Sequence, residues 1–136
     1  ALIKNSCLTF VCKWVILRTE TSRTAFTNKI PKNTILHIPI AHAEGRYFNE
    51  KNALKEMYDN DQIVFKYVDQ NGKEHEEANP NGSIDNIGGV CNLEGNVVGL
   101  MPHPERASEK ILSPFGTDNG KLIFESVIQH IKKKRS

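Results

Sequence analysis

The chain has 136 residues, a formal net charge of +2 and 38% hydrophobic residues, which predicts one folded domain over residues 1–136. The nearly balanced charge argues against nucleic acid as a partner, and the lack of a long apolar run argues against a membrane span. Three cysteines without a C-x-x-C pair argue against a disulfide scaffold. Because the chain start also does not resemble a signal peptide, we expect a cytoplasmic location.

Strand patterns dominate the first hundred residues. Runs of β-branched and aromatic residues predict strands at 8–18, 34–40, 62–68, 87–92 and 97–101. In the second run, Leu36, Ile38 and Ile40 alternate with other residues, so they are expected to face the core together. Polar loops are expected at 19–32 and 41–47, and turns at 69–72, 79–83 and 93–96. The last turn predicts a hairpin between the final two strands.

Helical patterns occur at two places, over residues 50–58 and 121–134. In the second, the spacing i, i+3, i+4, i+7 predicts a buried stripe made of Phe124, Val127, Ile128 and Ile131. Residues 132–135 (KKKR) are expected to form a solvated basic end. The mixture of elements predicts an α/β domain with a β-hairpin extension. It has too few helices for a complete doubly wound sheet.

The segment that follows the last predicted strand carries the most specific chemistry. His103 stands between Pro102 and Pro104, and Glu105 follows two residues later. Residues before proline favour extended backbone, in which side chains two apart point the same way, so we expect the Glu105 carboxylate to contact the imidazole. A base with its orienting carboxylate is two-thirds of a nucleophilic triad. The alternative is a proline-rich turn with a solvated histidine.

No residue in the sequence is an obvious nucleophile. Cys12 is predicted to lie in the core within a strand, and Cys7 precedes that strand without a helix after it. Cys91 is followed by a hairpin turn and not by the strand-to-helix elbow that exposes a nucleophile. We therefore predict structural roles for all three cysteines. The loop serines also lack a G-x-S-x-G frame: Ser83, Ser108 and Ser113.

The remaining histidines give only weak signals of a metal site. His37 is expected to be a core histidine, and His42 with Glu44 is expected in a surface loop. A zinc site made of His37, His42 and a cysteine is conceivable, but no H-E-x-x-H or paired-cysteine spacing supports it. We therefore predict no metal ligands, and without a phosphate-binding glycine loop we predict no cofactor-binding residues.

Several segments together resemble a known family. The segment 102–106 (PHPER) resembles the His/Glu half of the triad in class I glutamine amidotransferases. Segments 10–15, 39–47, 78–83 and 87–106 are similar to the glutaminase subunits of phosphoribosylformylglycinamidine synthase within that class. The resemblance covers nearly the whole chain. However, the Gly-x-Cys-Asn-Gly-x-Gln pattern of the family's nucleophile is absent from these 136 residues, so the chain resembles an incomplete, C-terminal part of a flavodoxin-like amidotransferase sheet.

The resemblance implies a glutaminase that supplies ammonia from glutamine for purine biosynthesis. Within it, His103 would be the general base of a Cys-His-Glu triad and Glu105 would orient it. The implied partners are a large synthetase subunit, which would hold ATP and Mg, and a small accessory subunit. The loop 41–47 is a candidate contact or wall of the active site. No cofactor is implied on this chain.

Three readings of the function remain open at this point. The first is the C-terminal part of a glutamine amidotransferase that is inactive alone. The second is a non-catalytic fragment or binding module that acts through the synthetase interface, and the third is a hydrolase that uses Cys91. Because part of a parallel sheet would be missing, an edge strand and apolar faces would be exposed, and we expect the chain to associate with itself.

Overall fold

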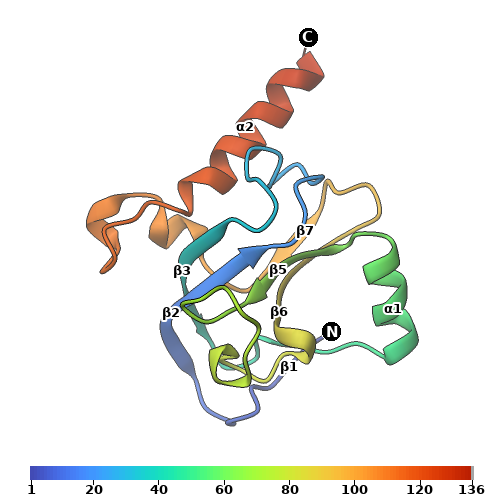
Figure 1. The fold of residues 1–136 in the computed structure, drawn as a ribbon, viewed down its shortest axis with the longest axis vertical. Coiled ribbons are helices and arrows are strands. Elements are labelled where there is room, and N and C mark those ends of the chain that lie inside the picture. Colours follow the sequence, from blue (N-terminus) through green and yellow to red (C-terminus); the bar gives the residue numbers. More distant parts are fainter. Residues whose placement is uncertain (136) are drawn as a thin grey trace.

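The computed structural model describes residues 1–135 and has a five-stranded sheet at its centre (Figure 1). The spatial order is β3-β2-β5-β6-β7, with strands β2 (Val11–Thr19), β3 (Ile35–His42), β5 (Ile63–Tyr67), β6 (Ile87–Cys91) and β7 (Val98–Leu100). Two short strands, β1 (Leu2–Ile3) and β4 (Arg46–Tyr47), pair with each other. The predicted α/β class and the β6–β7 hairpin are confirmed. All of these pairs are antiparallel, which differs from the parallel sheet that we expected.

The predicted helices and strands lie close to the observed ones. Helices α1 (Lys51–Asp59) and α2 (Lys121–Arg135) match the two helical patterns, and each predicted strand overlaps an observed one. The predicted loop 41–47 is more ordered than expected, because it contains the end of β3 and the whole of β4. Short 3-10 helices were not predicted. They are η1 (Glu76–Ala78), η2 (Ile84–Asn86), η3 (Pro104–Ala107) and η4 (Lys110–Leu112).

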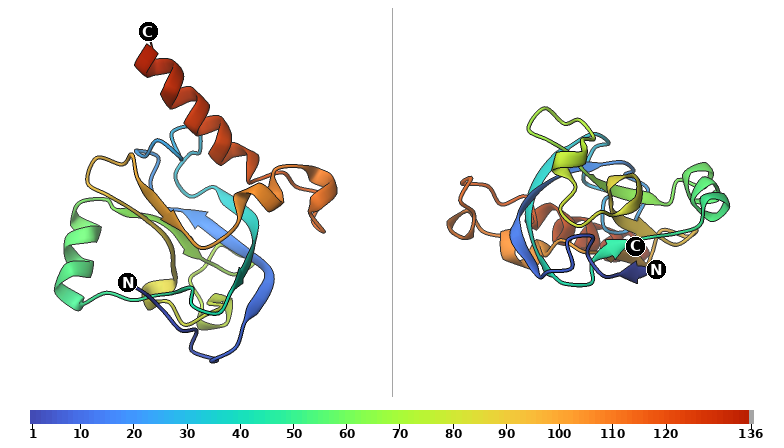
Figure 2. Two further views of the ribbon diagram at one scale, coloured as in Figure 1. Left: turned by 180° about the vertical axis from the view of Figure 1, so that it is seen from behind. Right: turned by 90° about the horizontal axis from the view of Figure 1, so that it is seen from below.

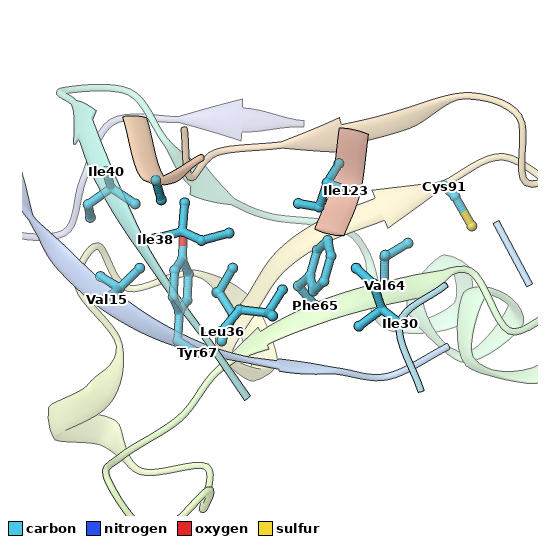
Figure 3. Close-up of a cluster of buried hydrophobic side chains, with 12 residues drawn as sticks. Val15, Ile30, Leu36, Ile38, Ile40, Val64, Phe65, Tyr67, Cys91 and Ile123 are labelled. Carbon is cyan, nitrogen blue, oxygen red and sulfur yellow. The ribbon is translucent and has the colours of Figure 1, made fainter. Parts of the chain in front are cut away.

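The main core lies on one face of the sheet and is closed by α2 and η3. Leu36, Ile38 and Ile40 are fully buried, as their alternation predicts. They pack with side chains of β2 and β5, and Ala107 of η3 and Ile123 of α2 belong to the same cluster (Figure 3). Helix α1 belongs to a second, smaller cluster of buried side chains, Leu54, Ile63 and Ile87. The core therefore holds η3, and with it His103, against the sheet.

Cys12 is exposed, so the prediction that it lies in the core was wrong. The buried residues of β2 are Val15, Leu17 and Thr19, which share one face of the strand. Cys12 differs from them by an odd number of residues, and side chains at odd spacing point to the opposite face of a strand. The apolar character of this segment correctly indicated a strand but not which face would be covered.

The predicted buried stripe of α2 is largely exposed. The exposed fractions are 42% for Phe124, 53% for Ile128 and 46% for Ile131, whereas Ile123 and Ser126 are buried. The reason is visible in Figures 1 and 2: α2 packs on the body of the molecule near its N-terminal end, and its remainder extends beyond the sheet. These three side chains, about half of whose surface is exposed, are called the apolar stripe of α2.

The apolar stripe is expected to drive self-association of this chain, since exposed apolar patches favour contact with other molecules. Replacing Ile128 and Ile131 with glutamine should shift the chain towards the monomer without loss of helix, because glutamine forms helix well. Sedimentation velocity at several concentrations measures this shift. Ile111→Gln is the control, because Ile111 is 88% exposed and belongs to η4, not to α2. A wild-type chain that stays monomeric at all concentrations would contradict the prediction.

Candidate active site

His103 and Glu105 are in direct contact, as their spacing predicts. Nδ1 of His103 lies 2.7 Å from Oε1 of Glu105, and both side chains are partly open to solvent. A carboxylate can only accept a hydrogen bond, so this contact places a proton on Nδ1 and leaves the Nε2 lone pair free. An imidazole in this state can take a proton from an incoming acid at Nε2.

The contact forms by a different route from the one that we expected. His103 has extended backbone, with φ of −103° and ψ of 90°, but Pro104 begins the 3-10 helix η3 and Glu105 lies inside it. Proline suits the first turn of a helix because its fixed φ is already helical and its missing N–H is not needed there. The turn, and not a continuous strand, therefore brings the carboxylate back to the imidazole.

The backbone around His103 is attached to the sheet and to the start of α2. The N–H of His103 donates to the carbonyl oxygen of Pro39 in β3 at 2.8 Å. On the other side of η3, the N–H of Gly120 donates to the carbonyl oxygen of Ala107 at 3.0 Å. A Cβ at Gly120 would overlap the carbonyl oxygen of Pro104, so only glycine permits this close approach.

Gly120→Ala is expected to destabilise the protein by about 1–3 kcal/mol, the usual cost of forcing extra volume into a packed site. It should also disturb the turn that carries Glu105, because the added methyl group pushes against Pro104. Urea unfolding followed by circular dichroism measures the free energy. Gly99→Ala is the matched control, since a Cβ at Gly99 meets Val90 only at an ordinary 3.8 Å. Equal stability of the two variants would contradict the prediction.

A cavity of about 300 Å³ opens beside the His103–Glu105 pair. Its walls are mostly apolar and come from β5, β7, α2 and the loop at Phe26. Phe124, which is part of the apolar stripe of α2, belongs to this lining. The lining residues other than the pair itself are Phe26, Phe65, Val98, Leu100, Pro102, Pro104, Ile123, Phe124 and Val127. The imidazole therefore borders a hollow, apolar surface.

The cysteines are not placed to act with His103, since none of them lines this cavity. Cys91 is buried, and burial raises the pKa of its thiol, which disfavours the thiolate. Cys7 is exposed, and the hydroxyl of Thr9, which donates to its sulfur, lowers the pKa of the thiol. An exposed thiol that does not line the cavity beside His103 is a weak candidate for a triad with this base.

The other predicted polar residues have structural partners. The Ser83 hydroxyl donates to Asn81 Oδ1, and the Ser113 hydroxyl lies 3.1 Å from that of Thr117. The His37 ring stacks on Phe115 with 4.7 Å between the ring centroids. Among residues 1–135, no group of three or more His, Cys, Asp or Glu side chains could hold a metal ion. No helix in the same range is long and apolar enough to cross a bilayer.

A buried polar cluster that the sequence did not reveal surrounds the end of β3. Asn5 is fully buried, and its side-chain amide donates to the carbonyl oxygens of Thr9 and His42. Asn81 is also fully buried and bonds to the 42–46 loop. The Asn-Pro-Asn-Gly signal at 79–82 correctly predicted a turn. However, turn residues are usually exposed, so nothing in the sequence indicated that this turn lies in the interior.

Comparison with known proteins gives a consistent family. Residues 1–131 match the CobB/CobQ-like glutamine amidotransferase domain. The chain is 54% identical over 132 residues to phosphoribosylformylglycinamidine synthase subunit PurQ of Methanocaldococcus jannaschii, a match that covers 97% of this chain and 56% of that protein. The subunit of the same name from Aquifex aeolicus is 52% identical over 128 residues, which cover 94% of this chain and 55% of that protein.

The fold matches as well. A chain in the structure of PurLQS from Thermotoga maritima superposes with a TM-score of 0.77 at 40% identity, covering 96% of this chain and 52% of that one. The chain thus spans about half the length of the curated relatives and of the solved structure that it matches. With the family match over residues 1–131, these similarities show that the chain belongs to the CobB/CobQ-like glutamine amidotransferase domain family and resembles its PurQ members.

Proposed function

We propose that this chain is the part of a glutamine amidotransferase that carries the general base and its orienting carboxylate, in an enzyme that supplies ammonia for phosphoribosylformylglycinamidine synthesis. The observation that carries the proposal is the 2.7 Å contact between His103 Nδ1 and Glu105 Oε1. It is supported by the names of the relatives, which are subunits of that synthase. His103 and Glu105 are the proposed catalytic residues.

In the proposed reaction, His103 Nε2 takes the proton of a cysteine thiol and the thiolate attacks the side-chain amide carbonyl of glutamine. The imidazolium then gives its proton to the leaving nitrogen, so ammonia departs and a thioester remains. Water, activated by the same nitrogen, hydrolyses the thioester to glutamate and frees the thiol. The Glu105 carboxylate stabilises the imidazolium in both halves of the reaction and stays ionised.

The nucleophilic cysteine is proposed to come from the part of the longer relatives that this chain does not cover. The cavity beside His103 and the apolar stripe of α2 share Phe124 and form one uncovered apolar surface next to the base. Such a surface suits burial beneath another part of the subunit. We therefore propose that the chain alone is inactive, and that the large synthetase subunit, with ATP and Mg, and a small accessory subunit complete the enzyme.

The proposal is tested by assaying glutamine hydrolysis with this chain alone and with a full-length subunit that carries this sequence and is assembled with its synthetase. We expect activity only in the assembled enzyme, and we expect it to survive Cys91→Ser, because Cys91 is buried and has a raised pKa. Hydrolysis by the chain alone that disappears in Cys91→Ser would overturn the proposal in favour of a hydrolase that uses this thiol.

A further inference from the structure

The orientation of the Asn81 amide is fixed by two backbone groups. The Ser83 N–H, which can only donate, lies 3.1 Å from Asn81 Oδ1, and the Gly45 carbonyl oxygen, which can only accept, lies 3.0 Å from Asn81 Nδ2. Exchanging the oxygen and nitrogen would pair donor with donor and acceptor with acceptor. The Asn81 NH₂ group therefore points to Gly45, and the same nitrogen lies 3.2 Å from Nε2 of His42.

This orientation determines the protonation of His42. Because Asn81 Nδ2 is a donor, His42 Nε2 must be the acceptor, and the proton of a neutral imidazole must lie on Nδ1. A protonated imidazole would direct a second N–H against the Asn81 NH₂ group. Burial also lowers the pKa of His42 below its ordinary value; a hydrogen bond with its own backbone acts against this shift, and the nearby His103 adds to it. Glu44 and Arg46 are the other charged side chains of the same loop.

His42 and His103 therefore differ in whether the Nε2 lone pair is free to accept a proton. In His103 the Nδ1 proton is used by Glu105 and the Nε2 lone pair is free, whereas in His42 the Nε2 lone pair is used by Asn81. His42 Nδ1 is buried and has no hydrogen-bond partner among residues 1–135.

The ring of His42 is held tightly against its own loop. A Cβ at Gly45 would overlap the imidazole, so the Gly45 backbone lies directly on the ring. The Gly45 N–H donates to Asn5 Oδ1 at 3.2 Å and its carbonyl oxygen accepts from Asn81, which immobilises the loop. The loop continues from β3, the strand whose Pro39 carbonyl oxygen holds the backbone of His103. A movement of the His42 ring would therefore move the end of the strand that positions the base.

We propose that His42 is a positioning residue of the active site, an Nδ1–H imidazole whose contacts with Asn81 and Gly45 fix the end of β3 beside His103. The positioning role in this inference rests on the proposed function. Its structural half, the tautomer of His42, can be tested without measuring any activity. It assigns a role to a histidine and an asparagine that the triad does not use. It also explains why two histidines at one edge of the sheet need not compete for the role of base.

The structural half is tested by ¹⁵N nuclear magnetic resonance of this chain with labelled histidine. At pH 8, His42 should show the Nδ1–H tautomer, and acid should protonate it only below the ordinary pKa of a histidine, because burial lowers its pKa. Asn81→Asp replaces the donor by an acceptor, so His42 should become protonated at a higher pH in that variant than in the wild type. An Nε2–H tautomer, or protonation of His42 at the same pH in both proteins, would overturn the inference whatever the enzyme does.

The positioning role is tested in the full-length subunit assembled with its synthetase. His42→Ala should lower kcat/KM for glutamine hydrolysis about 10-fold to 100-fold, the usual effect of removing an orienting partner. His42→Gln restores an acceptor for Asn81, so it should recover most of this loss and leave the pH midpoint of kcat/KM unchanged. Full activity of both variants, or an equal loss in both, would overturn the role. A wild-type enzyme without glutaminase activity would instead refute the proposed function.

Discussion

Replacing His103 with alanine should abolish glutamine-dependent synthesis by the assembled enzyme while synthesis from added ammonia continues. The imidazole is the only proposed acceptor for the thiol proton, and loss of such a base lowers kcat by about 10,000-fold or more in triad enzymes. The measurement compares product formation with glutamine and with ammonium salt as nitrogen donors. The ammonia-dependent rate serves as an internal control, because it requires no deprotonated thiol on this subunit.

Two further variants sharpen this test. Glu105→Gln removes the charge that stabilises the imidazolium and should also reduce only the glutamine-dependent rate. His75→Ala changes an exposed histidine that does not line the cavity beside His103 and should reduce neither rate. Unchanged glutamine-dependent synthesis in His103→Ala would refute the catalytic assignment and favour the non-catalytic reading, in which the chain acts only through the synthetase interface.

A large effect on stability is also expected from the ion pair between Lys66 and Glu74. Lys66 Nζ lies 2.7 Å from Glu74 Oε1, and the Lys66 side chain is only 9% exposed. The same ammonium lies 4.9 Å from the centre of the Tyr58 ring. Glu74→Gln would leave a buried positive charge without its counterion. We expect a loss of about 2 kcal/mol, less than for a fully buried pair because Glu74 is 39% exposed.

The same pair predicts a pH dependence. Burial alone would raise the pKa of Glu74, but hydrogen bonds from Lys66 and Arg18 outweigh it and leave the pKa below its ordinary value. A carboxyl with a lowered folded pKa stabilises the protein above its unfolded pKa, and this contribution is lost as the pH falls through the folded pKa. The difference between wild type and Glu74→Gln in urea unfolding should therefore shrink in acid.

Glu125→Gln is the control for this stability effect, because it breaks an exposed helical pair with Lys121 at 3.8 Å. Exposed pairs of this kind contribute about 0.5 kcal/mol or less. A loss of similar size in Glu74→Gln and Glu125→Gln would show that the Lys66 ammonium reaches solvent when its partner is neutral.

Sequence patterns located most of the fold but not the surfaces that are covered. Alternation in β3 correctly predicted a buried face at Leu36, Ile38 and Ile40, because the period of a strand is a local property. The apolar stripe of α2 was equally regular, yet most of it is exposed, because burial depends on what lies opposite the helix. The strands β1 and β4 were missed because two-residue strands form only through pairing between distant parts of the chain.

The candidate site could be predicted where its chemistry is local in sequence. The contact of His103 with Glu105 follows from a spacing of two residues, although the 3-10 turn that forms it was not anticipated. The role of Asn81 could not be anticipated, because its bond to His42 joins residues 39 positions apart and depends on the burial of a turn. Hydrogen bonds between distant residues leave no periodic pattern in the sequence.

The bond from the His103 N–H to Pro39 also has a consequence for hydrogen exchange. An amide that is hydrogen-bonded to a strand of the sheet exchanges with deuterium only when that part of the structure opens. The His103 amide should therefore exchange as slowly as the amides of β3, although its side chain is partly open to solvent. On heating, the base should keep its place until the sheet itself melts, so that loss of the site and loss of the fold occur in a single transition.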